Sequence, residues 1–415
     1  RQASYKKDAA SGLYFPSVDF EGRYTRIDEP IELDLNDIRT VMIKLFAAVD
    51  GVNVSSSVPD FKMTVQEETF YKSNVNFTWP IYTGGKISAI NNAANAKIIE
   101  SKENTRRVNA TLISELVKRY YGVRLAKDVV EVRQQVLESM EEHLKHAKRM
   151  QESGMIALSE KLHAEVTWSE AEREFKKAVR TLQITQAALN SLLASNEEIV
   201  PVSAMFILNS IEPLDSFQEH AEFSNPTLNQ IAMKRKQADD AYDIEKSDFY
   251  PTVYLFGKRE LHTEDLTALE PEWAVGIGFR YNLFSGFSSR SNMKAAQQLQ
   301  AQLGFLEHDA QIKINTLVEK RYNELMLSLE QFEATKTSLK FADEYVRVRN
   351  KAFTAGMTTS IDVVDAQLAL SRVKIERLNA AYQFDVALAQ LLEASGNSEQ
   401  FETYRNHNNS QELLQ

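Results

Sequence analysis

The sequence predicts a mostly α-helical protein that also carries four β-strands of the kind that build membrane barrels. Three observations point to this fold class. The chain is a tandem duplication, Gly (14) and Pro (9) are scarce among its 415 residues, and four segments alternate apolar with polar side chains. Few Gly and Pro residues favour long uninterrupted helices over a loop-rich fold.

The duplication is visible as a constant offset between matched residues. Gly154 and Gly356 lie 202 residues apart, and Lys-Arg-Tyr at 118–120 recurs at 320–322 with the same offset. No insertion interrupts this register, although ordinary loops drift in length. The offset therefore predicts long rigid helices that end at one level, in an assembly with pseudo-symmetry.

Two long helices are predicted, one in each repeat. Residues 86–152 contain no Pro and a single Gly, and their apolar residues recur at helical spacing. Such a helix spans about 100 Å at 1.5 Å per residue. The second copy covers about 287–353. Each long helix ends at a Gly turn and is followed by another helix, at about 158–195 and 360–395.

A further helical segment is predicted at about 227–247, after an irregular stretch. Residues 1–12 match residues 236–247, the end of that segment. The residues that would match 225–235 are missing ahead of the first residue. We therefore expect the N-terminal helix to be truncated.

The four predicted strands are 18–24, 70–79, 252–260 and 273–283. Alternation is strictest in the last of these, where large apolar residues occupy one face and Ala, Gly and polar residues the other. Each segment is close to the roughly 9–11 residues that cross a bilayer at a tilt. Apolar side chains outside and polar or small ones inside are typical of a membrane barrel. A soluble amphipathic sheet on a core is the alternative.

Four strands cannot close a membrane barrel, because the smallest known examples have about eight. An open sheet in lipid would leave backbone groups unpaired, at prohibitive cost. If these strands span a membrane, the chain must oligomerise. Two chains give eight strands and three give twelve, and only the larger barrel leaves room for a pore.

Composition and motifs exclude several function classes. A net charge of −10 argues against a general nucleic-acid binder, and the absence of Cys excludes disulfides and thiolate metal sites. No apolar stretch is long enough for a transmembrane helix. We find no phosphate-binding loop, nucleophile elbow or HExxH motif, so we expect neither enzyme activity nor a cofactor. His143 and His146 have a spacing that can bind metal, but nothing converges on them, so we expect solvated side chains and no metal.

The segments around the strands and the helical turn resemble the TolC-like family of bacterial outer-membrane efflux and secretion channels. The segments that carry this resemblance are 15–17 (Phe-Pro-Ser), 250–252 (Tyr-Pro-Thr), 77–85, 279–286 and 355–366. The resemblance implies a homotrimer with a shared twelve-stranded β-barrel in the lipid bilayer and a long α-helical coiled-coil tunnel across the periplasm. It also implies docking, through the tunnel tip, onto a periplasmic adaptor (membrane fusion) protein and an inner-membrane pump.

With this resemblance the chain divides into three kinds of region. The barrel strands and outer loops are expected at 13–84 and 249–284, the tunnel at 1–12, 85–195, 227–248 and 285–395, and the equatorial region at 196–226 and 396–415. The long loop 28–65 departs from the repeat, and its apolar residues recur at helical spacing. A short amphipathic helix is expected there. It could cover the pore or contact surface ligands, and the alternative is an outer loop without a role of its own.

Two acids near a helix start are candidate site residues. Asp362 and Asp365 are three apart and share a face. Thr359 with Asp362 also forms a capping-box pattern, a purely structural alternative that is compatible with the first. The resemblance implies that both acids ring the narrow periplasmic end of the tunnel. Six carboxylates from three chains would make a cation-selective constriction, and mutual repulsion would raise some of their pKa values.

The resemblance also implies a latch that closes the tip. Glu160 matches Asp362 at the repeat offset, and in the family such an acid is often held by an arginine two residues after the turn glycine. Here that residue is Thr358, and Phe353 stands where the family often has a tyrosine. We therefore expect closure to rest on other contacts or to be looser.

The two Gly turns are the expected adaptor contacts, because apolar side chains at a hairpin tip indicate an interface. The residues concerned are Gly154, Met155, Ile156, Leu158, Gly356, Met357 and Thr358. Local packing of a Gly-capped turn is the alternative. For the whole chain, the alternative to a passive exit duct is a soluble coiled-coil scaffold or adaptor. Drug efflux and protein secretion are not distinguished by the sequence.

Overall fold

The structure is a computed structural model that describes residues 1–48, 59–195, 197, 199–267, 270–407 and 410–413. The chain forms two compact units. The first comprises residues 1–99 and 233–303, and the second comprises residues 100–232 and 304–415. Each unit is described by itself.

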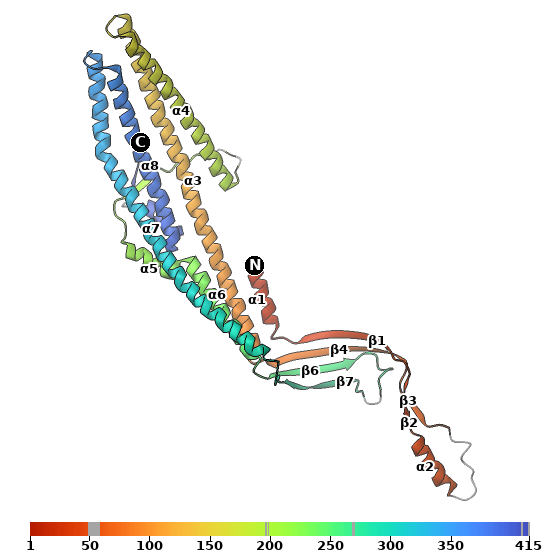
Figure 1. Cartoon of the computed structure of the whole chain (residues 1–415). Coiled ribbons are helices and arrows are strands. Elements are labelled where there is room, and N and C mark those ends of the chain that lie inside the picture. Colours follow the sequence, from red (N-terminus) through yellow and green to blue (C-terminus); the bar gives the residue numbers. More distant parts are fainter. Residues whose placement is uncertain (49–58, 196, 198, 268–269, 408–409, 414–415) are drawn as a thin grey trace. The chain divides into compact units, whose positions relative to one another are not determined.

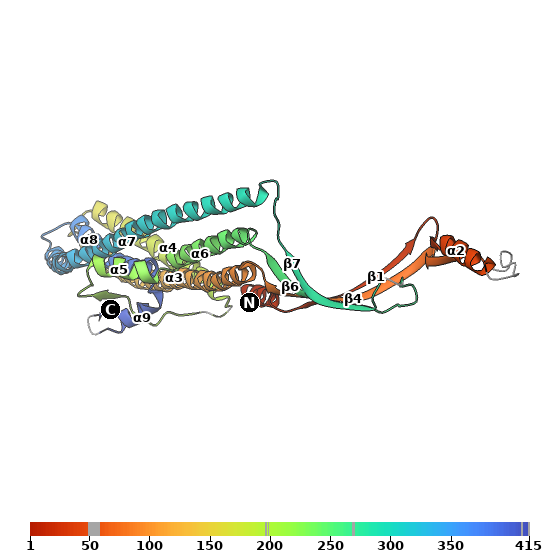
Figure 2. The same cartoon turned by 90° about the horizontal axis from the view of Figure 1, so that it is seen from below.

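The first unit is built around one antiparallel sheet with the strand order β1-β4-β6-β7. Its strands are β1 (Ser17–Arg26), β4 (Thr69–Tyr82), β6 (Thr252–Glu260) and β7 (Trp273–Arg280), and they lie side by side in Figures 1 and 2. All four predicted strands are present. β7 ends three residues earlier than predicted, because Arg280 pairs with Thr252, the first residue of β6. Pro251 precedes that residue and has no N–H to continue the ladder.

The two faces of the sheet differ as the alternation predicts. Val275, Ile277 and Phe279 point to one face and are 74%, 72% and 66% exposed in the single chain. The opposite face carries Gly276 and Gly278, which lie under the rings of Phe256 and Tyr254 on β6. A Cβ atom at Gly278 would approach the Tyr254 ring to 2.3 Å, and one at Gly276 would meet the Phe256 ring at 2.9 Å. These glycines therefore leave room for the two rings to lie over β7, and a larger residue at either position would displace a ring.

The sheet has two outer strands, β1 and β7. Each pairs on one side only, β1 with β4 and β7 with β6, among the residues that the structure describes. Both strands therefore present a row of backbone N–H and C=O groups at an open edge.

An outer hairpin extends between β1 and β4. The amphipathic helix expected in the long loop is present as α2 (Asn36–Ala47). It is flanked by two strands that the sequence analysis missed, β2 (Ile31–Asp34) and β3 (Lys62–Gln66), which pair with each other. Residues 49–58 of this loop lie outside the described residues.

Helical segments complete the first unit. Helix α1 (Gln2–Gly12) contacts the start of the long helix α3, where the Asn91 amide donates to the Ala10 carbonyl at 2.8 Å. Helix α6 (Pro226–Ser247) contacts the start of helix α7 through a 2.9 Å hydrogen bond from Gln300 to Asp239. Helices α3, α6 and α7 continue from this unit into the second one.

Two helical hairpins dominate the second unit (Figure 1). The first hairpin joins α3 (Lys86–Glu152) to α4 (Leu158–Leu193), and the second joins α7 (Ser288–Thr354) to α8 (Ser360–Ser395). These bounds lie within two residues of the predicted ones. Within the described ranges, no helix is both long and apolar enough to cross a membrane.

The main core of the second unit lies where the predicted helices α3, α7 and α8 meet two segments that the sequence analysis expected to be irregular or left unassigned. Residues 196–226 contain β5 (Phe206–Leu208) and α5 (Leu214–Ser224), and the C-terminal segment contains α9 (Phe401–Arg405) and β8 (Ser410–Glu412). Strand β5 pairs with β8 and packs on α8. Phe206 and Phe384 are fully buried there. Asp385 lies in the same core, and burial raises its pKa well above the ordinary value.

Candidate functional site at the helical turns

The two helical turns share one backbone geometry. Gly154 and Gly356 have φ values of 73° and 72°, in the left-handed region that favours glycine. After α3 the Met155 N–H donates to the Met150 carbonyl at 2.8 Å, and after α7 the Met357 N–H donates to the Ala352 carbonyl at 2.9 Å. Together with the bonds made by the two glycine N–H groups, these are Schellman motifs, which end each long helix at its glycine.

The helix that follows the second turn begins with a capping box. The Thr359 hydroxyl accepts from the Asp362 N–H at 3.4 Å, and Asp362 Oδ2 accepts from the Thr359 N–H at 3.0 Å. Thr359 and Asp362 therefore satisfy each other's backbone donors at the start of α8. The capping role considered for Asp362 is confirmed.

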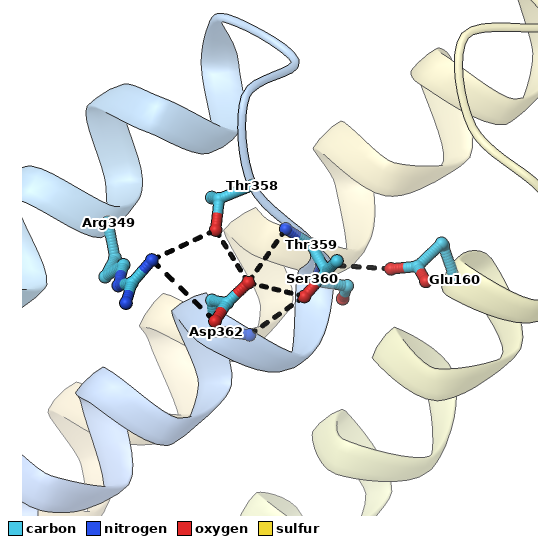
Figure 3. A network of polar contacts seen from close by, with 6 residues as sticks. All are labelled: Glu160, Arg349, Thr358, Thr359, Ser360 and Asp362. Carbon is cyan, nitrogen blue, oxygen red and sulfur yellow. Dashed lines mark hydrogen bonds and ion pairs between the residues drawn. The ribbon is translucent and has the colours of Figure 1, made fainter.

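Asp362 also ties α8 to α7 (Figure 3). The Thr358 hydroxyl donates to Asp362 Oδ2 at 2.6 Å, Arg349 Nη1 donates to that hydroxyl at 3.3 Å, and Arg349 lies 3.7 Å from Asp362 Oδ1. The hydroxyl of Thr358, that of Thr359 and the guanidinium of Arg349 lower the pKa of Asp362 to about 2. The expected rise of pKa concerns a ring of three chains, whereas within one chain the direction for Asp362 is the opposite.

Glu160 occupies the matching position in the first repeat and makes a different contact. Its Oε2 accepts from the backbone N–H of Ser360, the first residue of α8, at 2.9 Å. Figure 3 shows this carboxylate reaching from α4 toward the start of α8. A carboxylate at a helix N-terminus satisfies a free donor and interacts favourably with the helix dipole. Glu160 thus joins the two hairpins within one chain.

His143 is buried, and the expectation that it is solvated is wrong. It is 7% exposed, its Nε2 lies 2.6 Å from the hydroxyl of the fully buried Ser360, and its ring lies 4.7 Å from that of Phe353. Burial, together with the nearby His146 and His163, lowers the pKa of His143 to about 4. The sequence analysis considered only the neighbours of His143 on its own helix, whereas the residues that bury it come from α7 and α8.

A small apolar cluster supports the first turn. Leu144, Ala147 and Ala164 are buried together, and Ile156 from the turn packs against them. Met155 and Leu158 in the first turn and Met357 in the second remain 65%, 56% and 76% exposed in the single chain. Of the four apolar side chains among the predicted contact residues, Ile156 therefore has a clear packing role, and the other three are exposed.

Of the predicted latch residues, Thr358 and Glu160 reach the start of α8 and Phe353 contacts His143, whereas the two acids Asp362 and Asp365 differ in their surroundings. Asp362, Thr358 and Glu160 all meet the start of α8, whereas Asp365 is exposed, one turn further on. The contacts that Arg349 and Ser360 make were not predicted. Nothing in their local sequence marks them, since Ser360 matches Leu158 in the first repeat. In the part of the chain that is described, no group of three or more His, Cys, Asp and Glu side chains is arranged to hold a metal ion.

Comparison with known proteins shows which family has this architecture. A model of the outer membrane efflux protein family matches residues 1–195 and 219–397. The alkaline protease secretion protein AprF of Pseudomonas aeruginosa is 24% identical over 77% of this chain and 68% of its own length. The cobalt-zinc-cadmium resistance protein CzcC of Cupriavidus metallidurans is 24% identical over 78% of each chain.

Solved structures agree on the fold. The outer membrane protein VceC of Vibrio cholerae superimposes with a TM-score of 0.72 at 14% identity, and the match covers 95% of this chain and 90% of that one. The duplicated helical hairpins and the four-stranded sheet are thus those of an outer-membrane duct, and the alternative of a soluble scaffold is wrong. The chain belongs to the outer membrane efflux protein family, whose TolC-like members are non-enzymatic exit ducts that lie in the bacterial outer membrane and extend into the periplasm.

Proposed function

We propose that three copies of this chain form one exit duct, with a shared twelve-stranded barrel and a shared helical tunnel. The observation that carries this proposal is the four-stranded sheet with open edges at β1 and β7. Lipid offers no hydrogen bonds to such edges, so each must pair with another chain. Channels of this family are homotrimers that work with an adaptor and a pump. Three sheets of four strands close at a diameter that leaves a pore.

The test of this assembly is the molar mass of the purified protein in detergent, measured by light scattering and corrected for bound detergent. We expect three times the mass of one chain and precipitation when detergent is removed. A monomer or dimer that stays dispersed without detergent would overturn the shared barrel.

We infer that the helical turns form the periplasmic tip of the duct, which docks onto a periplasmic adaptor and, with it, an inner-membrane pump. The exposed Met155, Leu158 and Met357 support this role, because apolar side chains at a hairpin tip suit a protein interface. Gly154 and Gly356 set the backbone of the two turns, and Ile156 and Thr358 hold them from inside. The chain contains no motif for nucleotide binding, so the pump must supply the energy.

The latch that closes this tip rests, in our proposal, on Glu160, Phe353 and Thr358. Each contacts, directly or through one neighbour, the first turn of α8. The arginine that the family often places two residues after the turn glycine is replaced by Thr358, and Arg349 approaches Asp362 from one turn before the end of α7. The start of α8 is therefore the element whose displacement would open the tip.

Asp362 and Asp365 would line the constriction that this closed tip creates. Because Asp362 is already bonded to Thr358, Thr359 and Arg349, we expect the exposed Asp365 to contribute more to ion selectivity. Asp365→Asn should lower the preference for cations in single-channel recordings, and adding Asp362→Asn should lower it further. Glu376→Gln, on the same helix but three turns away, is the matched control. Unchanged selectivity in the double variant would remove both acids from the constriction.

A further inference from the structure

His143 and Ser360 form a buried contact between the two helical hairpins. His143 belongs to α3 of the first hairpin, and Ser360 is the first residue of α8 in the second. Their side chains meet at 2.6 Å, and Ser360 is fully buried while His143 is 7% exposed. The contact therefore lies at the same point of α8 that Glu160 holds through the backbone.

We propose that His143 in its neutral form is the residue that positions the start of α8 in the closed tip, and that its protonation releases α8. This inference rests on the proposed function, in which movement of α8 opens the duct. It adds a residue that the latch does not include and gives the latch a dependence on protons.

The surroundings of His143 oppose its protonation, and burial is the largest cause. On its own helix His146 lies one turn away, and His163 approaches from α4; both oppose a second positive charge, whereas the Glu160 carboxylate favours it more weakly. From α7 the Phe353 ring covers the imidazole. From α8 the helix N-terminus presents the positive end of its dipole, which also disfavours an imidazolium.

The hydrogen bond itself does not prevent protonation. An imidazolium can donate to the Ser360 hydroxyl as readily as a neutral ring can share a proton with it. The cost comes from placing a charge in a buried site near two other histidines and a helix N-terminus. Opening the tip exposes the imidazole to water and removes this cost, so protons favour the open state.

A cavity gives water access to this contact. It has a volume of about 220 Å³ and lies between α3, α7 and the start of α8, with Glu142, His146, Asn350 and Thr354 in its lining beside His143 and Phe353. This volume and these polar side chains are sufficient for several water molecules. Protons can therefore reach His143 without prior unfolding of either hairpin.

The size of the effect follows from the two states of the imidazole. We take the described contact as that of the closed state, where the pKa of His143 is about 4, and in an open, solvated state we expect the ordinary 6.5. A histidine whose pKa is lowered by closure stabilises the closed state above about pH 6.5, and that stabilisation is lost as the pH falls toward 4. Between about pH 7.5 and about pH 5 the open-to-closed ratio should rise about 30-fold per chain.

The experiment is a single-channel recording of the full-length trimer in lipid bilayers across this pH range. For the wild type we expect the open probability to rise on acidification. His143→Gln retains a donor and an acceptor near the position of Nε2 but cannot titrate. Its open probability should therefore stay low at both about pH 7.5 and about pH 5. His146→Gln keeps the contact but removes one of the neighbours that oppose a charge on His143, so it should retain an acid response that is weaker than that of the wild type. All other titrating groups are common to the three proteins.

A second variant protects the test against a folding defect. Ser360→Ala removes the partner but leaves the buried imidazole, so it should raise the open probability at about pH 7.5 and still respond to acid. An equal acid response in the wild type and in His143→Gln would overturn this inference while leaving the duct intact. A wild-type protein that forms no channel at any pH would instead overturn the proposed function itself.

Discussion

Glu160 and Asp362 occupy the same position of the two repeats, yet their carboxylates have different partners. Asp362 folds back onto its own helix and closes a capping box with Thr359. The residue that matches Thr359 in the first repeat is Ala157, whose side chain has no atom that can cap. Glu160 is therefore free to reach across to Ser360 in the other hairpin.

This difference shows how a duplicated structure can acquire a contact between its halves. The backbone of both turns remained the same, with a Schellman motif at each glycine. One side chain at the cap position decided whether the acid three residues later serves its own helix or the neighbouring one. The first turn is supported mainly by apolar packing, and the second by polar contacts.

The largest effect is expected from the apolar support of the first turn. Leu144→Ala should lower the free energy of local opening of that turn by about 2–3 kcal/mol, since it leaves a cavity beside Ala147 and Ala164. Hydrogen–deuterium exchange of the α3–α4 tip measures this, and Leu144→Met is the control of similar volume. Equal loosening of the α7–α8 tip would show that the two turns are not supported separately.

A smaller effect is expected from the capping box of the second turn. Thr359→Ala should cost about 1 kcal/mol of local stability, whereas Thr359→Ser should retain most of it. The pKa of Asp362 is lowered to about 2. The contribution of its ionised carboxylate to the stability of this turn is therefore fully present above its ordinary pKa of 3.8, and it is lost as the pH falls toward 2. Exchange rates of the first turn of α8 across this pH range measure both effects, and a serine variant as unstable as the alanine variant would contradict the capping role.

The smallest effect on stability is expected from a substitution that tests the difference between the two repeats directly. Ala157→Thr introduces the missing cap in the first repeat and should draw Glu160 back to its own helix, with a gain for α4 below about 1 kcal/mol. The amide of Ser360 should then exchange faster, because it loses its acceptor. Ala157→Val, of equal size but without a hydroxyl, is the control. If Ser360 were equally protected in both variants, the link between cap and crossing contact would be wrong.

The parts of the fold that follow from local pattern were predicted well. The long helix of the first repeat extends from Lys86 to Glu152 as expected, because a periodic run without Pro ends at a glycine turn. The core around Phe206 was missed, since a three-residue strand that pairs with the C-terminal segment has no periodicity to detect. His143 was noticed, but its environment is set by Ser360, 217 residues away, and local spacing carries no information about such a contact.

The open edges of the sheet have a consequence for how the protein reaches its membrane. Among the described residues β1 and β7 each pair on one side only, so a lone chain in the bilayer would carry unpaired backbone with it, and the membrane-inserted monomer is not an accessible intermediate. In water the same edges can pair with any exposed strand and invite aggregation. Biogenesis must therefore couple assembly to insertion, and its rate should depend steeply on the concentration of newly exported chains. The supply of proteins that cover these edges before assembly would then limit the number of ducts that a cell can make.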